Sequence, residues 1–314
     1  MRVLFTGASS FTGSWFVRAL AEAGHEVTAV FRRAPESYPD PLRRARATRV
    51  ASLCQSLVGV AFGEPRFRDA LRGGGFELLC HHGAEVGDYR SPAFDVAAAL
   101  AANTRDARAC LADFAAGGGR AVLLTASVFE RGEGLGDAPT DAVSPYGLAK
   151  SLTSDVFAFH APRAGLAFGR LVIPNPFGPF EEARFTAHLV TRWLAGETVA
   201  VRTPDYVRDN IHVDLLARAY VRFAESLPGS TAPARARPSG YVETQGAFAE
   251  RFAREMRRRL GVACALEHAV QTDWSEPRVR INTDRCDAAA LGWDESRAWD
   301  ALAAYYQRGA APTP

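Results

Sequence analysis

The 314-residue sequence has no apolar run close to the roughly 20 residues that a membrane-spanning helix needs. It has no internal repeat and no low-complexity linker, and its 37 basic residues are nearly balanced by 35 acidic ones. These absences argue against a membrane protein, a repeat array and a dedicated nucleic-acid surface. The composition predicts an ordinary globular protein with one large or two modest domains.

Cysteine is scarce, and the five cysteines have neither CxxC nor zinc-ligand spacing. We therefore expect free thiols in a reducing cytoplasm rather than a disulfide set. The run Met1–Gly7 is typical of a strand that begins at once, which predicts that no signal peptide is present. We interpret His81, His82 and His212 as packing or strand-end residues, so no metal site is predicted.

The first half alternates short apolar runs with helical patterns, which is typical of a parallel sheet built from βαβ units. Strands are predicted over 2–6, 26–31, 76–81, 120–125 and 167–173, and helices over 13–23, 92–116 and 146–161. The Pro- and Arg-rich segment 34–57 is interpreted as an inserted loop and helix. After Pro174 strands become scarce, and helices are predicted over 184–195, 213–226, 245–260 and 296–307, with a surface loop over 227–239.

A glycine-rich turn joins the first predicted strand to the first helix. Its residues are Gly7, Ala8, Ser9, Ser10, Phe11, Thr12 and Gly13, with Ser10 where a G-x-x-G-x-x-G turn has its middle glycine. Such a turn brings a helix N-terminus to a dinucleotide pyrophosphate. Together with the βαβ pattern it predicts an α/β, doubly wound Rossmann domain over 1–173, to which 205–226 returns. A smaller, mainly helical substrate domain is predicted over 174–314.

The end of the second strand bears on the choice of cofactor. A carboxylate there would suit the ribose 2′-hydroxyl of NAD, but the chain has Phe31, Arg32 and Arg33. A guanidinium suits a 2′-phosphate, so NADP is favoured over NAD. The alternative is a pair of solvated arginines. Further basic residues at 43, 44, 46 and 49 are either solvated or directed toward the same phosphate.

Tyr146 and Lys150 are four residues apart on a predicted helix, so their side chains lie one turn apart on one face. A neighbouring ammonium favours the phenolate and makes the tyrosine a suitable acid/base. Thr125, at the end of a predicted strand, is the expected third member that orients the reacting oxygen, with Ser127 as the reserve. Asn103 is expected to bind the cofactor, hold a backbone carbonyl, or lie on a helix surface.

These residues resemble the extended short-chain dehydrogenase/reductase family, especially its nucleotide-sugar epimerases, dehydratases and ketoreductases. The resemblance implies that Tyr146 exchanges a proton with a sugar hydroxyl, that Lys150 binds the cofactor ribose, and that Thr125 binds the reacting oxygen. It also implies a homodimer built through helices near 92–116 and 146–161.

The second half resembles the same family. Asn175-Pro-Phe-Gly178 is similar to its N-P-x-G segment, and the run from Arg208 to Asp214 is similar to its R-D-x-I-H-V-x-D segment. The resemblance implies that Asn175 and Arg208 bind the substrate diphosphate, with Arg184, Arg278 and Arg280 as weaker candidates. The alternative for Arg208 is an ion pair with Asp209 or Asp214.

The chain also departs from the family. The 4,6-dehydratases have Thr-Asp-Glu where this chain has Thr125, Ala126 and Ser127, which argues against a dehydratase. Phe129-Glu130 replaces the family's Tyr-Gly. The resemblance therefore implies a cytoplasmic nucleotide-sugar epimerase, with an NADPH-dependent 4-keto nucleotide-sugar reductase as the alternative. A non-catalytic dinucleotide sensor and a reductase of apolar substrates are further alternatives.

Overall fold

The computed structural model describes residues 1–135 and 141–309, which divide into two compact units. The first unit contains residues up to Glu133, residues 141–173 and a returning segment, 217–237. The second consists mainly of 174–216 and the residues from Pro238 onward. The returning segment therefore lies later in the chain than the expected 205–226.

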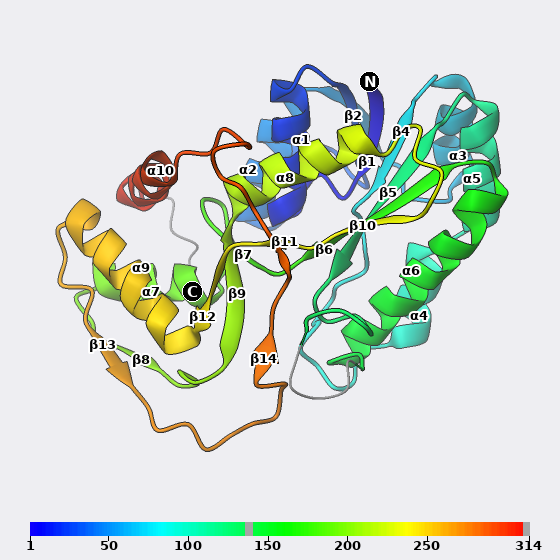
Figure 1. Ribbon diagram of the computed structural model, residues 1–314. Coiled ribbons are helices and arrows are strands. Elements are labelled where there is room, and N and C mark those ends of the chain that lie inside the picture. Colours follow the sequence, from blue (N-terminus) through cyan, green and yellow to red (C-terminus); the bar gives the residue numbers. More distant parts are fainter. Residues whose placement is uncertain (136–140, 310–314) are drawn as a thin grey trace. The chain divides into compact units, whose positions relative to one another are not determined.

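A seven-stranded parallel sheet forms the centre of the first unit (Figure 1). Its strand order is β10-β6-β5-β4-β1-β2-β3, so the chain winds outward in both directions from β1 and β4. This arrangement confirms the predicted doubly wound α/β class. The strands are β1 (Arg2–Thr6), β2 (Glu26–Phe31), β3 (Gln55–Val58), β4 (Leu78–His81), β5 (Ala121–Ser127), β6 (Ala167–Ile173) and β10 (Ala234–Ala236).

Helices cover both faces of this sheet (Figure 1). One face has α1 (Phe11–Glu22), α2 (Pro41–Ala51) and α8 (Val213–Ser226). The short 3-10 helix η1 (Pro35–Ser37) precedes α2 in the chain. The other has α3 (Pro65–Gly73), α4 (Val96–Asn103), α5 (Ala107–Ala116) and α6 (Pro145–Arg163). Phe67, Phe114 and Phe157 fill the second interface, and the Phe16 and Tyr220 rings stack at 4.0 Å in the first.

Three local predictions for this unit were wrong in part. Segment 34–57 contains the predicted helix, α2, but also begins the edge strand β3, whose half-exposed residues lack apolar alternation. The predicted helix over 92–116 breaks into α4 and α5 at Asp106, which has a left-handed φ of 49°. Segment 227–239 contains β10, an Ala-Arg-Ala strand that pairs with β6. Its composition has no β preference, so tertiary pairing decides its conformation.

The second unit surrounds a smaller sheet, in which β9 (Val207–His212) pairs with β7 (Asn175–Phe177), β12 (Tyr241–Thr244) and β14 (Val279–Arg280). Helices α7 (Phe185–Leu194), α9 (Gln245–Leu260) and α10 (Glu295–Gln307) confirm three predicted helices. Their aromatic residues, including Trp193, Phe252 and Trp299, form a separate core. Two short pairs complete the unit: β8 (Val199–Val201) with β13 (Leu266–His268), and β11 (Pro238–Ser239) with β15 (Asp284–Arg285).

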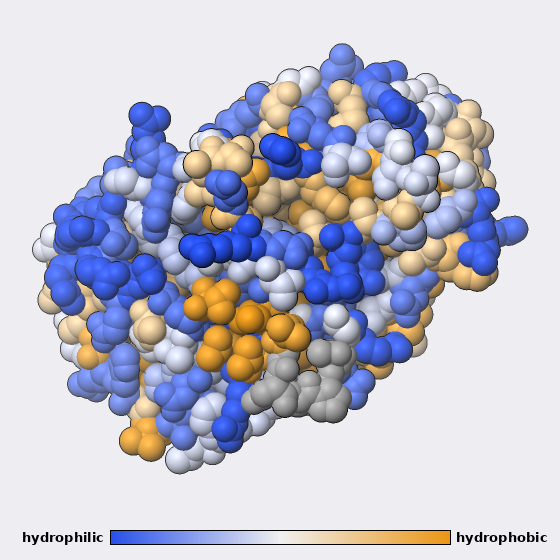
Figure 2. All heavy atoms as spheres, in the orientation of Figure 1, coloured by the Kyte–Doolittle hydropathy of each residue, from blue (hydrophilic) through white to orange (hydrophobic). Residues whose placement is uncertain are grey.

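The face drawn in Figure 2 is mostly hydrophilic, with smaller hydrophobic patches between the polar residues. Within the two described ranges, the structure contains no helix of the length and apolarity needed to cross a membrane. All five cysteines are free, as the sequence predicts.

Candidate active site

The glycine turn between β1 and α1 depends on close backbone contacts. Gly7 has φ 79°, and a Cβ there would lie 2.6 Å from the Gly83 amide nitrogen. A Cβ on Gly13 would lie 2.3 Å from the Gly7 carbonyl oxygen. Ser10 caps α1: its Oγ accepts a hydrogen bond from the Gly13 N–H and donates to the Gly7 carbonyl. The serine in place of the middle glycine therefore stabilises the turn.

Arginines gather beside this turn, around the ring of Tyr38. The Arg43 Nε donates to the Ser9 Oγ at 3.0 Å, and the Arg43 guanidinium lies 4.9 Å from the centre of the Tyr38 ring. The Arg33 guanidinium lies 5.7 Å from the same ring. Arg32 forms an ion pair with Glu85 at 3.6 Å. Burial lowers the pKa of Arg43, and the charges of neighbouring arginines, including Arg32 and Arg33, lower it further.

Lys150 points into the protein from α6. Its side chain is buried, and its Nζ donates to the backbone carbonyl of Thr125 at 2.6 Å. Burial lowers the pKa of Lys150, while the Glu130 carboxylate acts in the opposite direction. Lys150 is also the only lysine in the sequence, since the other 36 of the 37 basic residues are arginines. A lysine that is the only one in the sequence is a signal of a specific role, and it is independent of the spacing to Tyr146.

Tyr146 lies one turn before Lys150 on α6 and is half-buried. The Ser144 Oγ caps the helix by accepting from the Gly147 N–H, as the sequence suggests. The Tyr146 ring is surrounded edge-on by three aromatic rings at centroid distances between 5.8 and 6.2 Å; they belong to Tyr89, Phe94 and Phe129. The tyrosine is therefore held in an aromatic setting beside an inward-pointing ammonium.

The two hydroxyl candidates lie at the carboxyl end of β5. The Thr125 Oγ1 is hydrogen-bonded to the His82 Nδ1 at 2.9 Å, and the His82 Nε2 contacts the Ser10 Oγ at 2.9 Å. Burial lowers the pKa of His82 to about 3, so the ring is neutral and connects β5 to the glycine turn. The Ser127 Oγ accepts from the Phe129 N–H at 3.3 Å. The structure thus places Thr125 against Lys150 through its backbone and against His82 through its side chain.

Asn103 is buried at the end of α4, so its interpretation as a helix-surface residue is wrong. Its Oδ1 accepts from the Glu85 N–H at 2.7 Å, and its Nδ2 donates to the Thr153 Oγ1 at 3.4 Å. Its backbone carbonyl contacts the His81 Nε2 at 3.1 Å. Asn103 therefore connects α4 to α6 and to the loop after β4.

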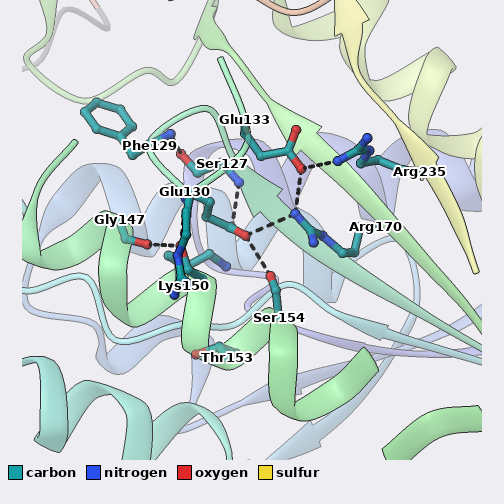
Figure 3. Close-up of polar contacts among 12 residues, drawn as sticks. Ser127, Phe129, Glu130, Glu133, Gly147, Lys150, Thr153, Ser154, Arg170 and Arg235 are labelled. Atoms are coloured by element: carbon teal, nitrogen blue, oxygen red, sulfur yellow. Dashed lines mark hydrogen bonds and ion pairs between the residues drawn. The ribbon is translucent and has the colours of Figure 1, made fainter. Parts of the chain in front are cut away.

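A buried ionic network lies behind Lys150, and no sequence motif predicted it. Figure 3 shows the Glu130 carboxylate directed toward Ser127, Ser154 and Arg170, and Glu133 toward Arg170 and Arg235. Glu130 and Glu133 are both buried. Glu130 is the residue that departs from the family's Tyr-Gly pair, and this departure was the available signal.

The second unit contains the candidates for substrate phosphate. Arg208 of β9 and Arg280 of β14 are register partners, both are buried, and both contact the Glu276 Oε2, at 3.0 and 2.6 Å. The expected ion-pair alternatives for Arg208 were Asp209 and Asp214, but its observed carboxylate partner is Glu276. Burial lowers the pKa of Arg208 to about 10.

The other substrate candidates occupy different elements of this unit. Asn175 lies on β7 as the register partner of Asn210. Arg184 precedes α7 and forms a 3.6 Å ion pair with Glu182. Arg278 lies over the ring of Trp274 at 4.5 Å. Of all the candidates for substrate binding in the second unit, Arg208 and Arg280 are the two that lie together, because both contact Glu276.

The first unit fits a nicotinamide dinucleotide on structural grounds. The glycine turn is so tight that a Cβ at Gly13 would collide with the Gly7 carbonyl, and the start of α1 beyond it suits a pyrophosphate. The arginines around Tyr38 suit the adenosine end, and Lys150 supplies a cation beside Tyr146. Fold and site together define an enzyme of the extended short-chain dehydrogenase/reductase type.

The family follows from comparison of the sequence with known families. The model of the NAD dependent epimerase/dehydratase family matches residues 3–233. The chain belongs to this family. No match was found among curated proteins.

Solved structures of similar fold cover almost the whole chain. UDP-glucose 4-epimerase from Thermotoga maritima, solved with UDP-glucose, is 20% identical, covers 99% of this chain and 100% of its own, and has a TM-score of 0.72. A variant of UDP-glucuronic acid 4-epimerase from Bacillus cereus, in complex with NAD, is 16% identical, with 98% and 99% coverage and a TM-score of 0.74. The dTDP-glucose 4,6-dehydratase from Streptomyces venezuelae, solved with NAD, is 19% identical, with 98% and 97% coverage and a TM-score of 0.72.

Proposed function

We propose that this protein is an NADP-dependent nucleotide-sugar epimerase. The observation that carries the proposal is the position of Lys150, which is buried on α6 with its ammonium against the end of β5 and one turn from Tyr146. A tyrosine beside a fixed cation is suited to exchange a proton with a hydroxyl near neutral pH.

In the proposed reaction Tyr146 removes the proton from a sugar hydroxyl and later returns it. Lys150 stabilises the phenolate and donates to the cofactor ribose. Thr125 or Ser127, at the end of β5, holds the reacting oxygen. A nicotinamide held by the glycine turn and Lys150 would supply the hydride acceptor and donor for the sugar carbon that carries this oxygen.

Arg208 and Arg280 are the proposed diphosphate ligands. Their guanidinium groups lie on the register partners β9 and β14 and both contact the Glu276 carboxylate, and paired guanidinium groups are suited to bind a diphosphate. Asn175 and Arg184 are further proposed contacts. Firm binding of the nucleotide leaves the sugar free to turn, which an epimerase requires.

The preference for NADP is supported by Arg32, Arg33 and Arg43 beside the turn. Replacing Arg32 and Arg33 by Asp and Asn should transfer the preference to NAD. Titration of the wild type and the double variant with both cofactors tests this, and an unchanged preference would refute it.

The direct test of the epimerase is incubation with a panel of nucleotide-diphosphate sugars. The expected result is an equilibrium of two epimers without net change in cofactor absorbance. Stoichiometric loss of NADPH absorbance with a 4-keto sugar would instead establish the alternative, a reductase. Denaturing the purified protein adds independent evidence, because a retained dinucleotide favours the epimerase.

We also propose a cytoplasmic homodimer that associates through α4 and α6. The solvent-facing side of α4 is lined with exposed alanines, and α6 exposes Leu148 and Phe159. Helix α4 contains no charged residue, and an uncharged helix surface of this kind suits a four-helix interface. Light scattering at low protein concentration tests this, and a monomer at all concentrations would contradict it.

A further inference from the structure

Glu130 fixes the loop after β5 to the helix that carries Lys150. The Glu130 side chain has no solvent exposure. Its Oε1 accepts from the Ser127 N–H at 2.8 Å, and its Oε2 accepts from the Ser154 hydroxyl at 2.7 Å. Ser127 lies two residues after the carbonyl that binds Lys150, and Ser154 lies one turn after Lys150 on α6. The carboxylate thus spans the two elements that hold the ammonium (Figure 3).

The contacts of Glu130 stabilise the ionised form of its carboxylate. All its hydrogen-bond partners are donors, and the Arg170 Nη2 adds an ion pair at 3.5 Å. Burial raises the pKa of Glu130, while the Lys150 ammonium lowers it. Arg170 has a nearer partner, since its Nη2 lies 2.6 Å from Glu133, which also pairs with Arg235 and Arg237. Arg170 is therefore shared between Glu133 and Glu130, and the Glu130 carboxylate also acts on the Lys150 ammonium.

The charged groups that act on Lys150 come from several elements. Glu130 favours its ammonium, and Arg170 of β6 opposes it. His81 and His82, at the end of β4, are buried, and both have pKa values lowered to about 3, so they are neutral. Of the two described residues whose charges shift the Lys150 pKa, Glu130 is the negative one and raises it.

We propose that Glu130 is a positioning residue whose carboxylate keeps Lys150 protonated and in place for Tyr146. A buried ammonium without a counter-charge would lose its proton more easily, because the low-dielectric interior disfavours the charged form. Glu130 acts through Lys150 and does not contact the substrate. The effect on catalysis rests on the proposed function, whereas the effect on Lys150 does not.

The single lysine makes this proposal directly measurable. Protein grown with ε-¹³C-lysine will show one lysine side-chain NMR signal, and its shift with pH gives the Lys150 pKa without assignment or substrate. We expect Glu130→Gln, which keeps the shape and removes the charge, to lower this pKa by about one unit or more, or at least tenfold in the proton equilibrium. Ser154→Ala is the matched control, since it removes a hydrogen bond to the same carboxylate and keeps its charge.

A second variant keeps the test decisive if Glu130→Gln does not fold. Glu130→Asp withdraws the carboxylate by one methylene, so the Lys150 pKa should fall, but by less than in Glu130→Gln. The expected order is wild type and Ser154→Ala, then Glu130→Asp, then Glu130→Gln. An unchanged Lys150 pKa in the Glu130 variants, or an equal decrease in Ser154→Ala, would overturn the proposal.

Kinetics provide a second readout. In Glu130→Gln the alkaline limb of the kcat profile should move to lower pH, while KM for the nucleotide sugar stays constant. A merely structural role would lower kcat without moving this limb. If no nucleotide sugar is converted at all, the proposed function fails, and the NMR titration still decides the role of Glu130.

Discussion

Arg43 offers a sharp test of the adenosine end of the site. Its guanidinium is held between the Ser9 hydroxyl and the Tyr38 ring, within a group that includes Arg32 and Arg33. This fixed position reduces the entropy lost when the side chain binds a phosphate. Burial and the neighbouring positive charges disfavour the cation in the free protein, as its lowered pKa indicates. A dianionic 2′-phosphate would relieve that repulsion.

The magnitude follows from one charge-assisted contact. A hydrogen bond between charged partners contributes about 1.5–3 kcal/mol, which corresponds to roughly 10–150-fold in affinity. Arg43→Ala should therefore weaken NADPH binding by that factor. NADH, which has no 2′-phosphate, should bind almost as before.

Isothermal titration calorimetry with both cofactors measures this difference directly. Arg66→Ala is the matched control, because it removes the same charge from exposed Arg66 on α3. Equal losses for NADPH and NADH in Arg43→Ala would show that Arg43 only supports the fold of the turn. No loss for either cofactor would refute the assignment of the arginines to the 2′-phosphate.

Three further perturbations test other parts of the structure. Tyr146→Phe keeps the ring and its aromatic contacts but should lower kcat by roughly 10²–10⁴-fold with unchanged dinucleotide affinity; retained turnover would exclude its acid/base role. Gly13→Ala should lower the melting temperature by on the order of 5 °C, because the added Cβ meets the Gly7 carbonyl, whereas Gly73→Ala in open space should not. Glu181 is buried, and burial raises its pKa from 4.5 to about 7, so the folded chain retains a proton that the unfolded chain releases. Stability should therefore fall by up to about 3 kcal/mol as pH rises from 4.5 to 7, and urea unfolding of Glu181→Gln should show a smaller decrease.

Regular patterns made most of the fold predictable. The strands at Arg2–Thr6, Glu26–Phe31 and Ala167–Ile173 match their predicted bounds because apolar residues dominate each of them, as is typical of a parallel sheet. The edge strands β3 and β10 were missed, since edge positions need little apolar sequence. Helix α4 ends at Asn103 and α5 begins after Asp106, with no proline or glycine between them to mark the break.

The candidate site also contains residues that local sequence patterns indicate and residues that depend on distant contacts. Tyr146 and Lys150 could be predicted because four-residue spacing on a helix is local information. Arg43 and Glu130 could not, since their partners lie 34 residues away at Ser9 and 24 residues away at Ser154. Their roles depend on tertiary contacts that no spacing encodes. The roles assigned to the substrate-binding arginines stay predictions.

The chain leaves the first unit after Ile173 and returns to it at Ala217, and this order has a consequence for biosynthesis. Its sheet ends with β10, and the Phe5 and Phe16 rings are covered by Tyr220 of α8, so both closing elements are synthesised well after β6. A nascent chain ending near Ile173 would present an unpaired β6 edge and an uncovered aromatic surface, both of which favour aggregation. Fragments intended to isolate this unit therefore need residues 217–237 joined to it, and a cut at residue 173 would remove them.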